Sequence, residues 1–199
     1  MDALTHAIEA YTSRNRFDDT DRDASMAIKL LFEHLPLTYQ DGSNLKAREM
    51  VAPASFLAGF AFTKASLGYV HAISHQISAH YNTPHGLANA VILPRVLRFN
   101  ERASAERFTQ LEQMLSNAAD AQDDGVLASR FIARVDALAE QIAIPANLPD
   151  LDTKDFHSIG KAAIAEARTS YAVPRTMARK HVEKILQSVA NEGRDVSFA

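Results

Sequence analysis

The sequence predicts an all-α fold, a single multi-helix bundle. Apolar residues recur at helical spacing through most of the 199-residue chain. Polar breaks that contain glycine or proline separate these segments, at residues 40–44, 82–84 and 143–152. No segment reads as a convincing β-strand. Because 47% of the residues are apolar, the chain can bury a real core, and we expect one domain over residues 1–199.

Three helices are expected in the first third of the chain. Residues 2–13 carry apolar side chains on one face, at Ala3, Leu4, Ala7, Ile8 and Tyr11. Residues 21–39 form the second helix, which Pro36 is expected to bend or end. Residues 45–63 are apolar on every side, so we expect this helix to be buried at the centre, with Gly59 allowing a neighbour to approach closely.

The remaining chain is also expected to be helical. A fourth helix over residues 67–81 stops at the Asn-Thr-Pro break, and a fifth restarts at residue 85 and runs to residue 100 past a kink at Pro94. Further helices are expected over residues 105–118, 126–142, 153–167 and 177–190. The polar turn at residues 120–125 lacks linker composition around it, so we interpret it as a loop within one domain.

The composition excludes several classes of protein. A formal net charge of −3 argues against nucleic acid or an anionic membrane as the partner. The absence of cysteine excludes disulfides, thiolate ligands and a cysteine nucleophile, and it fits a cytoplasmic, reducing location. There is no apolar run long enough for a membrane span, no secretory signal, no G-x-G-x-x-G and no G-x-S-x-G. Because the chain starts directly in a helix, we expect it to be a domain of something longer.

Four histidines cluster between residues 67 and 100, and an aspartate and a histidine, Asp2 and His6, lie near the N-terminus. The clustered histidines are His71, His75, His80 and His85. Asp2 and His6 share a helix face because they are four residues apart, and so do His71 and His75. One carboxylate and two or three imidazoles converging from three helices would form a nitrogen/oxygen site for Fe(II), Zn(II), Mn(II) or Ni(II), with positions open for a substrate oxygen.

The spacing also fits simpler arrangements. Asp2 and His6 could form a surface pair, and His71 and His75 could be hydrogen-bonded core residues. His80 is expected to face solvent. Spacing alone does not show that the N-terminal helix lies beside the histidine helix.

Two motifs give the chain a family resemblance. Residues 1–11 read MDALTHAIEAY, and residues 70–75 (VHAISH) are followed by 84–90 (PHGLANA) and by Leu93-Pro94. In order and spacing this resembles the iron-containing (group III) alcohol dehydrogenase family. The chain departs from the family pattern at Ser78, where many members have glycine, and at Val173 of Val173-Pro174-Arg175, where the family has asparagine.

The resemblance implies a fold and a ligand set. The chain corresponds to the C-terminal metal-binding helical domain, also called a dehydroquinate synthase-like α domain. The family's N-terminal Rossmann-like domain, which binds NAD(P), is absent from this chain. Asp2, His6, His71 and His85 match the metal ligands, for Fe(II) or alternatively Zn(II). His75 matches a histidine that lies near the substrate and nicotinamide and serves as the catalytic residue.

The resemblance also implies an activity. The full-length enzyme would oxidise small alcohols or reduce aldehydes by metal-assisted hydride transfer with NAD(P), whereas the isolated chain is expected to be inactive. Association with a second copy of the chain or with a separate cofactor domain is expected. The alternatives are a non-catalytic helical remnant or assembly module, and a metal-dependent hydrolase that needs no nicotinamide.

Overall fold

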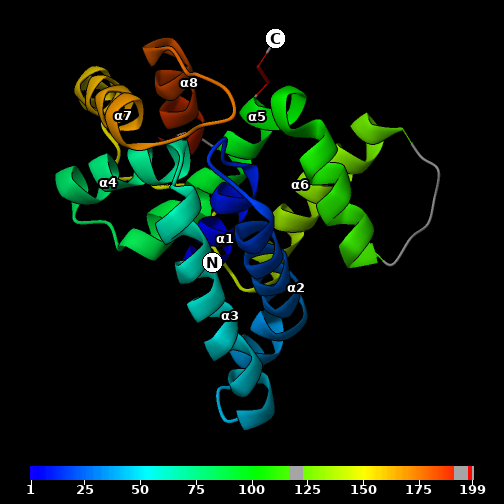
Figure 1. Ribbon diagram of the computed structural model, residues 1–199. Helices are drawn as coiled ribbons and strands as arrows, with labels where there is room; N and C mark the ends of the chain where they lie inside the picture. The colour runs from blue at the N-terminus through cyan, green and yellow to red at the C-terminus, as the bar shows by residue number, and fades with distance from the viewer. Residues whose placement is uncertain (117–122, 191–196, 199) are drawn as a thin grey trace.

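The computed structural model describes residues 1–116, 123–190 and 197–198. Within these residues the fold is helical and contains no strand, which confirms the expected all-α class (Figure 1). The elements are α1 (Asp2–Thr12), α2 (Asp18–Gln40), α3 (Leu45–Ala65), α4 (Tyr69–Tyr81), α5 (His85–Ser116), α6 (Asp124–Gln141), η1 (Thr153–Asp155), α7 (Phe156–Ser170) and α8 (Arg179–Ala190).

The short helix α1 lies at the centre of the bundle and packs against α2, α3 and α5. Helices α2 and α3 form a hairpin whose far end projects away from the rest of the molecule (Figure 1). On the other side, α4 packs against α5 and α7, and α7 packs against α8. The start of α1 therefore faces the layer that contains the histidine helices α4 and α5.

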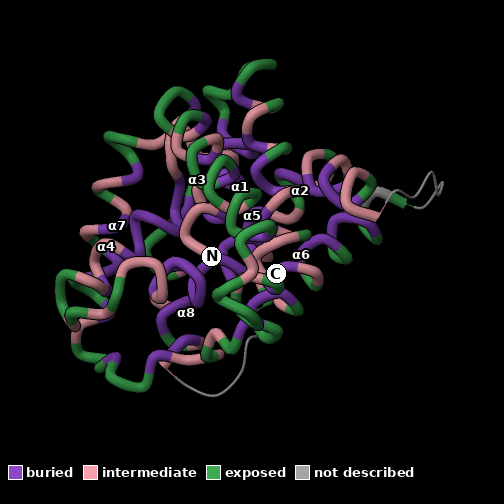
Figure 2. The backbone as a smooth tube through the Cα atoms, turned by 90° about the horizontal axis from the view of Figure 1, so that it is seen from below, coloured by how far each residue is buried: buried purple, intermediate pink, exposed green. Residues whose placement is uncertain are grey.

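Burial follows from the apolar pattern of α1. Four apolar residues of α1 are fully buried, namely Leu4, Ala7, Ile8 and Ala10. Buried residues run through the middle of the bundle (Figure 2). Removing such side chains from water is the main term that stabilises a helical bundle of this kind. The burial fixes the roll of α1 about its axis, and with it the direction in which the polar residues of the same helix point.

The expectation that α3 is a buried central helix was wrong. Its buried face consists of alanines alone, namely Ala47, Ala54, Ala58, Ala61 and Ala65. The large residues Phe56 and Phe60 face outward and are 70% and 44% exposed. A Cβ added at Gly59 would meet nothing within 4 Å, so no neighbour approaches there. The small alanine face allows α3 to lie close to α1 and α2, while its bulky apolar face is uncovered.

Neither proline ends its helix. Pro36 lies inside α2, which continues to Gln40, and Pro94 lies inside α5, which continues to Ser116. The non-helical residue in α5 is Ser104 (φ −121°, ψ 16°), ten residues beyond Pro94. The expected end of a helix at residue 118 and the first half of the expected turn at 120–125 lie outside the described residues.

Among the described residues, no single helix is long and apolar enough to cross a membrane. Helices α3 and α4 reach the required length and composition only when taken together, and they are bent by 104° relative to each other.

Candidate metal centre

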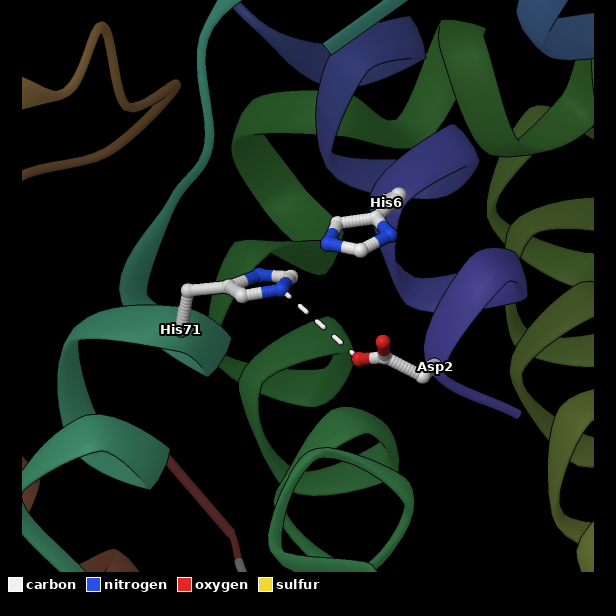
Figure 3. Close-up of side chains that lie close together, drawn as sticks. All are labelled: Asp2, His6 and His71. Carbon is white, nitrogen blue, oxygen red and sulfur yellow. Dashed lines mark ion pairs between the residues drawn. The ribbon is translucent and has the colours of Figure 1, made fainter. Parts of the chain in front are cut away.

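The first two turns of α1 supply a carboxylate and an imidazole to one side of the helix. Asp2 is the first residue of α1, and His6 lies four residues later. The His6 ring stacks between Phe62 of α3, at a centroid distance of 4.3 Å, and His71 of α4, at 4.6 Å. Stacking on both faces holds the imidazole in one orientation. The structure thus brings the two halves of the predicted site together (Figure 3).

His71 and His85 approach from the starts of two other helices. His71 is the third residue of α4 and is only 1% exposed, whereas His85 is the first residue of α5 and is 39% exposed. The Nε2 atom of His71 lies 3.9 Å from Asp2 Oδ1, and the Nε2 atom of His85 lies 3.5 Å from the same oxygen. Ligating atoms of Asp2, His6 and His71 all lie within 4.8 Å of one another.

One amide nitrogen marks the point on which these atoms converge. Nδ2 of Asn89 lies 2.6 Å from Asp2 Oδ1, 2.9 Å from His85 Nε2 and 3.1 Å from His71 Nε2. An amide NH2 group carries two hydrogens, so it cannot donate fully to three acceptors. The amide oxygen of Asn89 is buried and accepts no hydrogen bond. Three acceptors directed at one buried position form a set that a cation can satisfy better than this amide.

The spacing of the acceptor atoms fits a small divalent cation. Two atoms that each lie about 2.0–2.1 Å from one metal ion are at most about 4.2 Å apart. The distances of 3.5 and 3.9 Å from Asp2 Oδ1 to the two Nε2 atoms lie within this limit. Imidazole nitrogens with one carboxylate oxygen suit iron or zinc, and they do not select one of these metals over the other.

The protonation of the cluster also favours ligation. Burial, together with the neighbouring His71, lowers the pKa of His6 to about 4 against the opposing effect of Asp2. Burial lowers the pKa of His85 as well. Burial raises the pKa of Asp2, but the hydrogen bond from Asn89 and the nearby histidines outweigh it, so the pKa lies below its usual range. At neutral pH His6 and His85 are therefore neutral and Asp2 is ionised, the forms that bind metals.

His75 lies beside this cluster and has a carboxylate partner of its own. Its ring stacks on that of His85 at a centroid distance of 5.2 Å, and its Nδ1 atom lies 2.7 Å from Oε1 of Glu166 on α7. Tyr171 and Gln76 donate hydrogen bonds to the two oxygens of the same carboxylate. Burial and the hydrogen bond to Glu166 raise the pKa of Tyr171, so its hydroxyl stays protonated and donates.

Sequence reasoning missed three polar residues of this region. Glu9 and Asn89 carried a usable signal, because Glu9 is three residues beyond His6 and Asn89 is four residues beyond His85, on shared helix faces. Glu166 carried none, since it meets His75 across 91 residues of sequence. His80 is exposed, as expected.

The comparisons with known proteins agree on one family. The family model described as "Fe-containing alcohol dehydrogenase family, C-terminal" matches residues 1–190. A 1,3-propanediol dehydrogenase of Citrobacter freundii is 42% identical over 192 residues, which is 94% of this chain and 49% of that protein. An NAD-dependent methanol dehydrogenase of Bacillus methanolicus is 34% identical over 190 residues, again 94% of this chain and 50% of that protein.

A solved structure shows the same arrangement of helices. The crystal structure of a 1,3-propanediol oxidoreductase matches with a TM-score of 0.90 at 38% identity, over 95% of this chain and 50% of that one. The chain thus spans about half the length of the curated relatives it matches.

Proposed function

The chain belongs to the Fe-containing alcohol dehydrogenase family, as its motifs predicted, and on that premise we propose that it forms the metal-binding side of an alcohol dehydrogenase active site. The reaction is the NAD(P)-dependent oxidation of a small alcohol, or the reverse reduction of an aldehyde. Domain organisation follows from the same proposal. Residues 1–199 are one helical domain, and NAD(P) is bound by a Rossmann-like domain outside this chain.

Asp2, His6, His71 and His85 are the proposed ligands of a divalent metal, Fe(II) or alternatively Zn(II). The metal, when bound, supplies a Lewis acid that polarises the oxygen of the substrate. The protein's part is to present neutral imidazoles and one carboxylate from rigid helices. The stacked ring of His6 and the buried ring of His71 are held by packing, whereas Asp2 and His85 are partly open to an incoming substrate.

We assign to His75 the uptake and release of the hydroxyl proton of the alcohol substrate. Because Glu166 lies against Nδ1, the other ring nitrogen, Nε2, is the atom that is left to take up a proton. The carboxylate of Glu166 would then stabilise the imidazolium cation. Tyr171 and Gln76 keep that carboxylate in place. His75 is 39% exposed, so it can exchange the proton with water.

The observation that carries the proposal is the convergence of Asp2 Oδ1, His71 Nε2 and His85 Nε2 on the amide nitrogen of Asn89. These three atoms come from three helices, of which α1 is far from the consecutive helices α4 and α5 in the sequence. Such a convergence is more than one amide can satisfy, and it is what a cation site needs.

Elemental analysis of the chain, purified without chelator or nickel resin, tests the proposal. We expect stoichiometric iron or zinc in the wild type and in His80→Ala, whose ring is exposed and away from the site. His71→Ala and His85→Ala should each lose the metal. Stoichiometric metal that survives both substitutions would refute the ligand assignment.

Activity assays separate the proposal from its alternatives. Residues 1–199 alone should show no NAD(P)-dependent alcohol oxidation, because on this proposal NAD(P) is bound by a domain outside them. Hydrolysis of an ester or amide without nicotinamide would instead favour a metal-dependent hydrolase. A chain with neither metal nor turnover would favour a helical remnant or assembly module. The cytoplasmic location and association with a second copy or with a separate cofactor domain stay predictions.

A further inference from the structure

A buried carboxylate that belongs to no predicted ligand lies directly behind His71. Glu9 is in the third turn of α1 and is 7% exposed. Its Oε1 atom accepts a hydrogen bond from Val70 N at 2.8 Å, and its Oε2 atom accepts one from Gly68 N at 2.9 Å. The same Oε2 atom lies 2.6 Å from Nδ1 of His71. One side chain of α1 therefore binds both the start of α4 and the histidine of its first turn.

The hydrogen bonds decide which nitrogen of His71 carries the proton. Two backbone N–H groups already donate to Glu9, so the side chain acts as an acceptor, which is the role of an ionised carboxylate. An acceptor at 2.6 Å from Nδ1 requires a hydrogen on that nitrogen. In a neutral imidazole Nε2 is then unprotonated, with its lone pair free. Asn89 Nδ2, a donor, lies 3.1 Å from Nε2, which agrees with this tautomer.

The carboxylate also serves the helix to which His71 belongs. The N-cap residue of α4 is Gly68, which has no side chain, so the helix start has no side-chain cap from its own N-cap residue. Glu9, on helix α1, acts as the cap instead. It accepts hydrogen bonds from two of the N–H groups that a helix start leaves free, and it places a negative charge there. A Cβ on Gly68 would lie 2.6 Å from Glu9 Oε1, so the missing side chain of Gly68 makes room for this carboxylate.

We propose that Glu9 is the positioning residue of the metal centre, which fixes His71 as the Nδ1–H tautomer and directs its Nε2 lone pair toward Asp2 and His85. The proposal rests on the proposed metal site, because the tautomer matters for function only where Nε2 is a ligand. Glu9 does not contact the converging point itself. It acts through His71, in the manner of outer carboxylates that orient metal-binding histidines.

The substitution Glu9→Gln gives the sharpest test. Glutamine has nearly the same shape but only one acceptor oxygen, while three donors face it. Its NH2 group would therefore face the N–H of Val70 if it takes the place of Oε1, or both the N–H of Gly68 and Nδ1 of His71 if it takes the place of Oε2. In the second case it donates to Nδ1, and the proton of the ring moves to Nε2, which can then bind no metal.

Two matched variants control for charge and for stability. Glu166→Gln removes the carboxylate partner of His75, which is not a proposed ligand. Glu112→Gln removes a fully buried carboxylate that pairs with Arg134 between α5 and α6, away from the centre. Neither should change metal affinity, although the second should reduce stability.

Two measurements are made on the wild type and on the three variants. Nitrogen-15 NMR of the metal-free chain at about pH 8, well above the usual histidine pKa of about 6.5, reports the tautomer of His71. Competition titration with Zn(II) reports metal affinity. We expect the Nδ1–H form in the wild type, and Zn(II) binding weakened about 10–100-fold in Glu9→Gln alone.

The outcomes separate this inference from the function on which it rests. A His71 tautomer that is Nε2–H in the wild type, or a Zn(II) affinity that Glu9→Gln leaves unchanged, overturns the role of Glu9. Zn(II) affinity that falls equally in all three variants also overturns it, because the effect would then be one of stability. An Nδ1–H tautomer in a wild-type chain that binds no metal would support the orientation by Glu9 and would instead refute the proposed metal centre.

Discussion

Gly68→Ala should destabilise the chain because its new methyl group would collide with Glu9. The methyl carbon would lie 2.6 Å from Oε1, 3.0 Å from Cδ and 3.5 Å from Cγ of that one side chain, and no other group lies within these distances. The backbone of Gly68 is extended (φ −148°, ψ −156°), which alanine can adopt. The expected damage is therefore steric and falls on the carboxylate rather than on the backbone.

The hydrogen bonds of Glu9 determine how much stability Gly68→Ala should lose. Relieving a 2.6 Å contact to an ordinary 3.4 Å moves the carboxylate by 3.4 − 2.6 = 0.8 Å. A shift of this size breaks one or two of the three bonds, which measure 2.6–2.9 Å. Each bond to a charged group contributes about 1.5–3 kcal/mol, and alanine stabilises by about 0.4–1 kcal/mol through the unfolded chain. These values bracket a net loss of about 0.5–5 kcal/mol, and we expect about 2–3 kcal/mol, near the middle of that range.

Urea unfolding of the chelator-treated protein, followed by circular dichroism, measures this loss. In a chain of this size about 2–3 kcal/mol corresponds to a fall in Tm of roughly 5–10 °C. Gly59→Ala is the matched control, because a Cβ there meets nothing within 4 Å and the residue lies inside helix α3. It should stabilise by about 0.4–1 kcal/mol. Equal effects of the two substitutions, or a Gly68→Ala protein as stable as the wild type, would refute the reasoning.

Two further results are expected of the metal-free chain. Folded His6 has a pKa of about 4, below the unfolded value of 6.5, so its stabilising contribution is complete above pH 6.5 and is lost as pH falls toward 4. Equilibrium unfolding at several pH values should show this fall in the free energy of unfolding, and His6→Phe should reduce the slope of that free energy against pH by up to one proton. A slope that His6→Phe leaves unchanged would contradict the pKa shift. Glu112→Gln should lower the free energy of unfolding by about 2 kcal/mol, because Glu112 is 0% exposed and binds Arg134 through both oxygens, while the exposed part of Arg134 can regain water. A loss below about 0.5 kcal/mol in urea unfolding would show that the pair is dispensable.

The sequence predicted the helices and most of the polar residues of the site, for a local reason. Apolar residues at helical spacing mark helices, and pairs four residues apart, such as Asp2 and His6, reveal a shared face. What the pattern could not supply was the packing between helices. The meeting of Glu166 with His75, and the fact that alanines rather than Phe56 and Phe60 form the buried face of α3, depend on which helices become neighbours.

The same limit applied to the prolines. Pro36 was expected to bend or end its helix, and Pro94 to kink a helix that continues, since proline lacks an N–H and crowds the preceding turn. Both are buried within helices that continue. Packing of the surrounding helix outweighs the local penalty there, as tertiary contacts commonly outweigh propensity. Local chemistry therefore located the elements, while their exact ends and their buried faces came from the assembled bundle.

The charges around the proposed centre explain why two carboxylates are needed. Asp2 and His85 are the first residues of α1 and α5, and His71 lies in the first turn of α4. Helix starts carry partial positive charge, which is unfavourable for a cation. The ionised carboxylates of Asp2 and Glu9 offset this and also match a divalent charge, so that the loaded centre would be close to neutral. Burying a neutral assembly avoids the large cost of burying an unpaired ion. Glu9 would thus orient His71 and complete the charge balance, although it contributes no ligand atom.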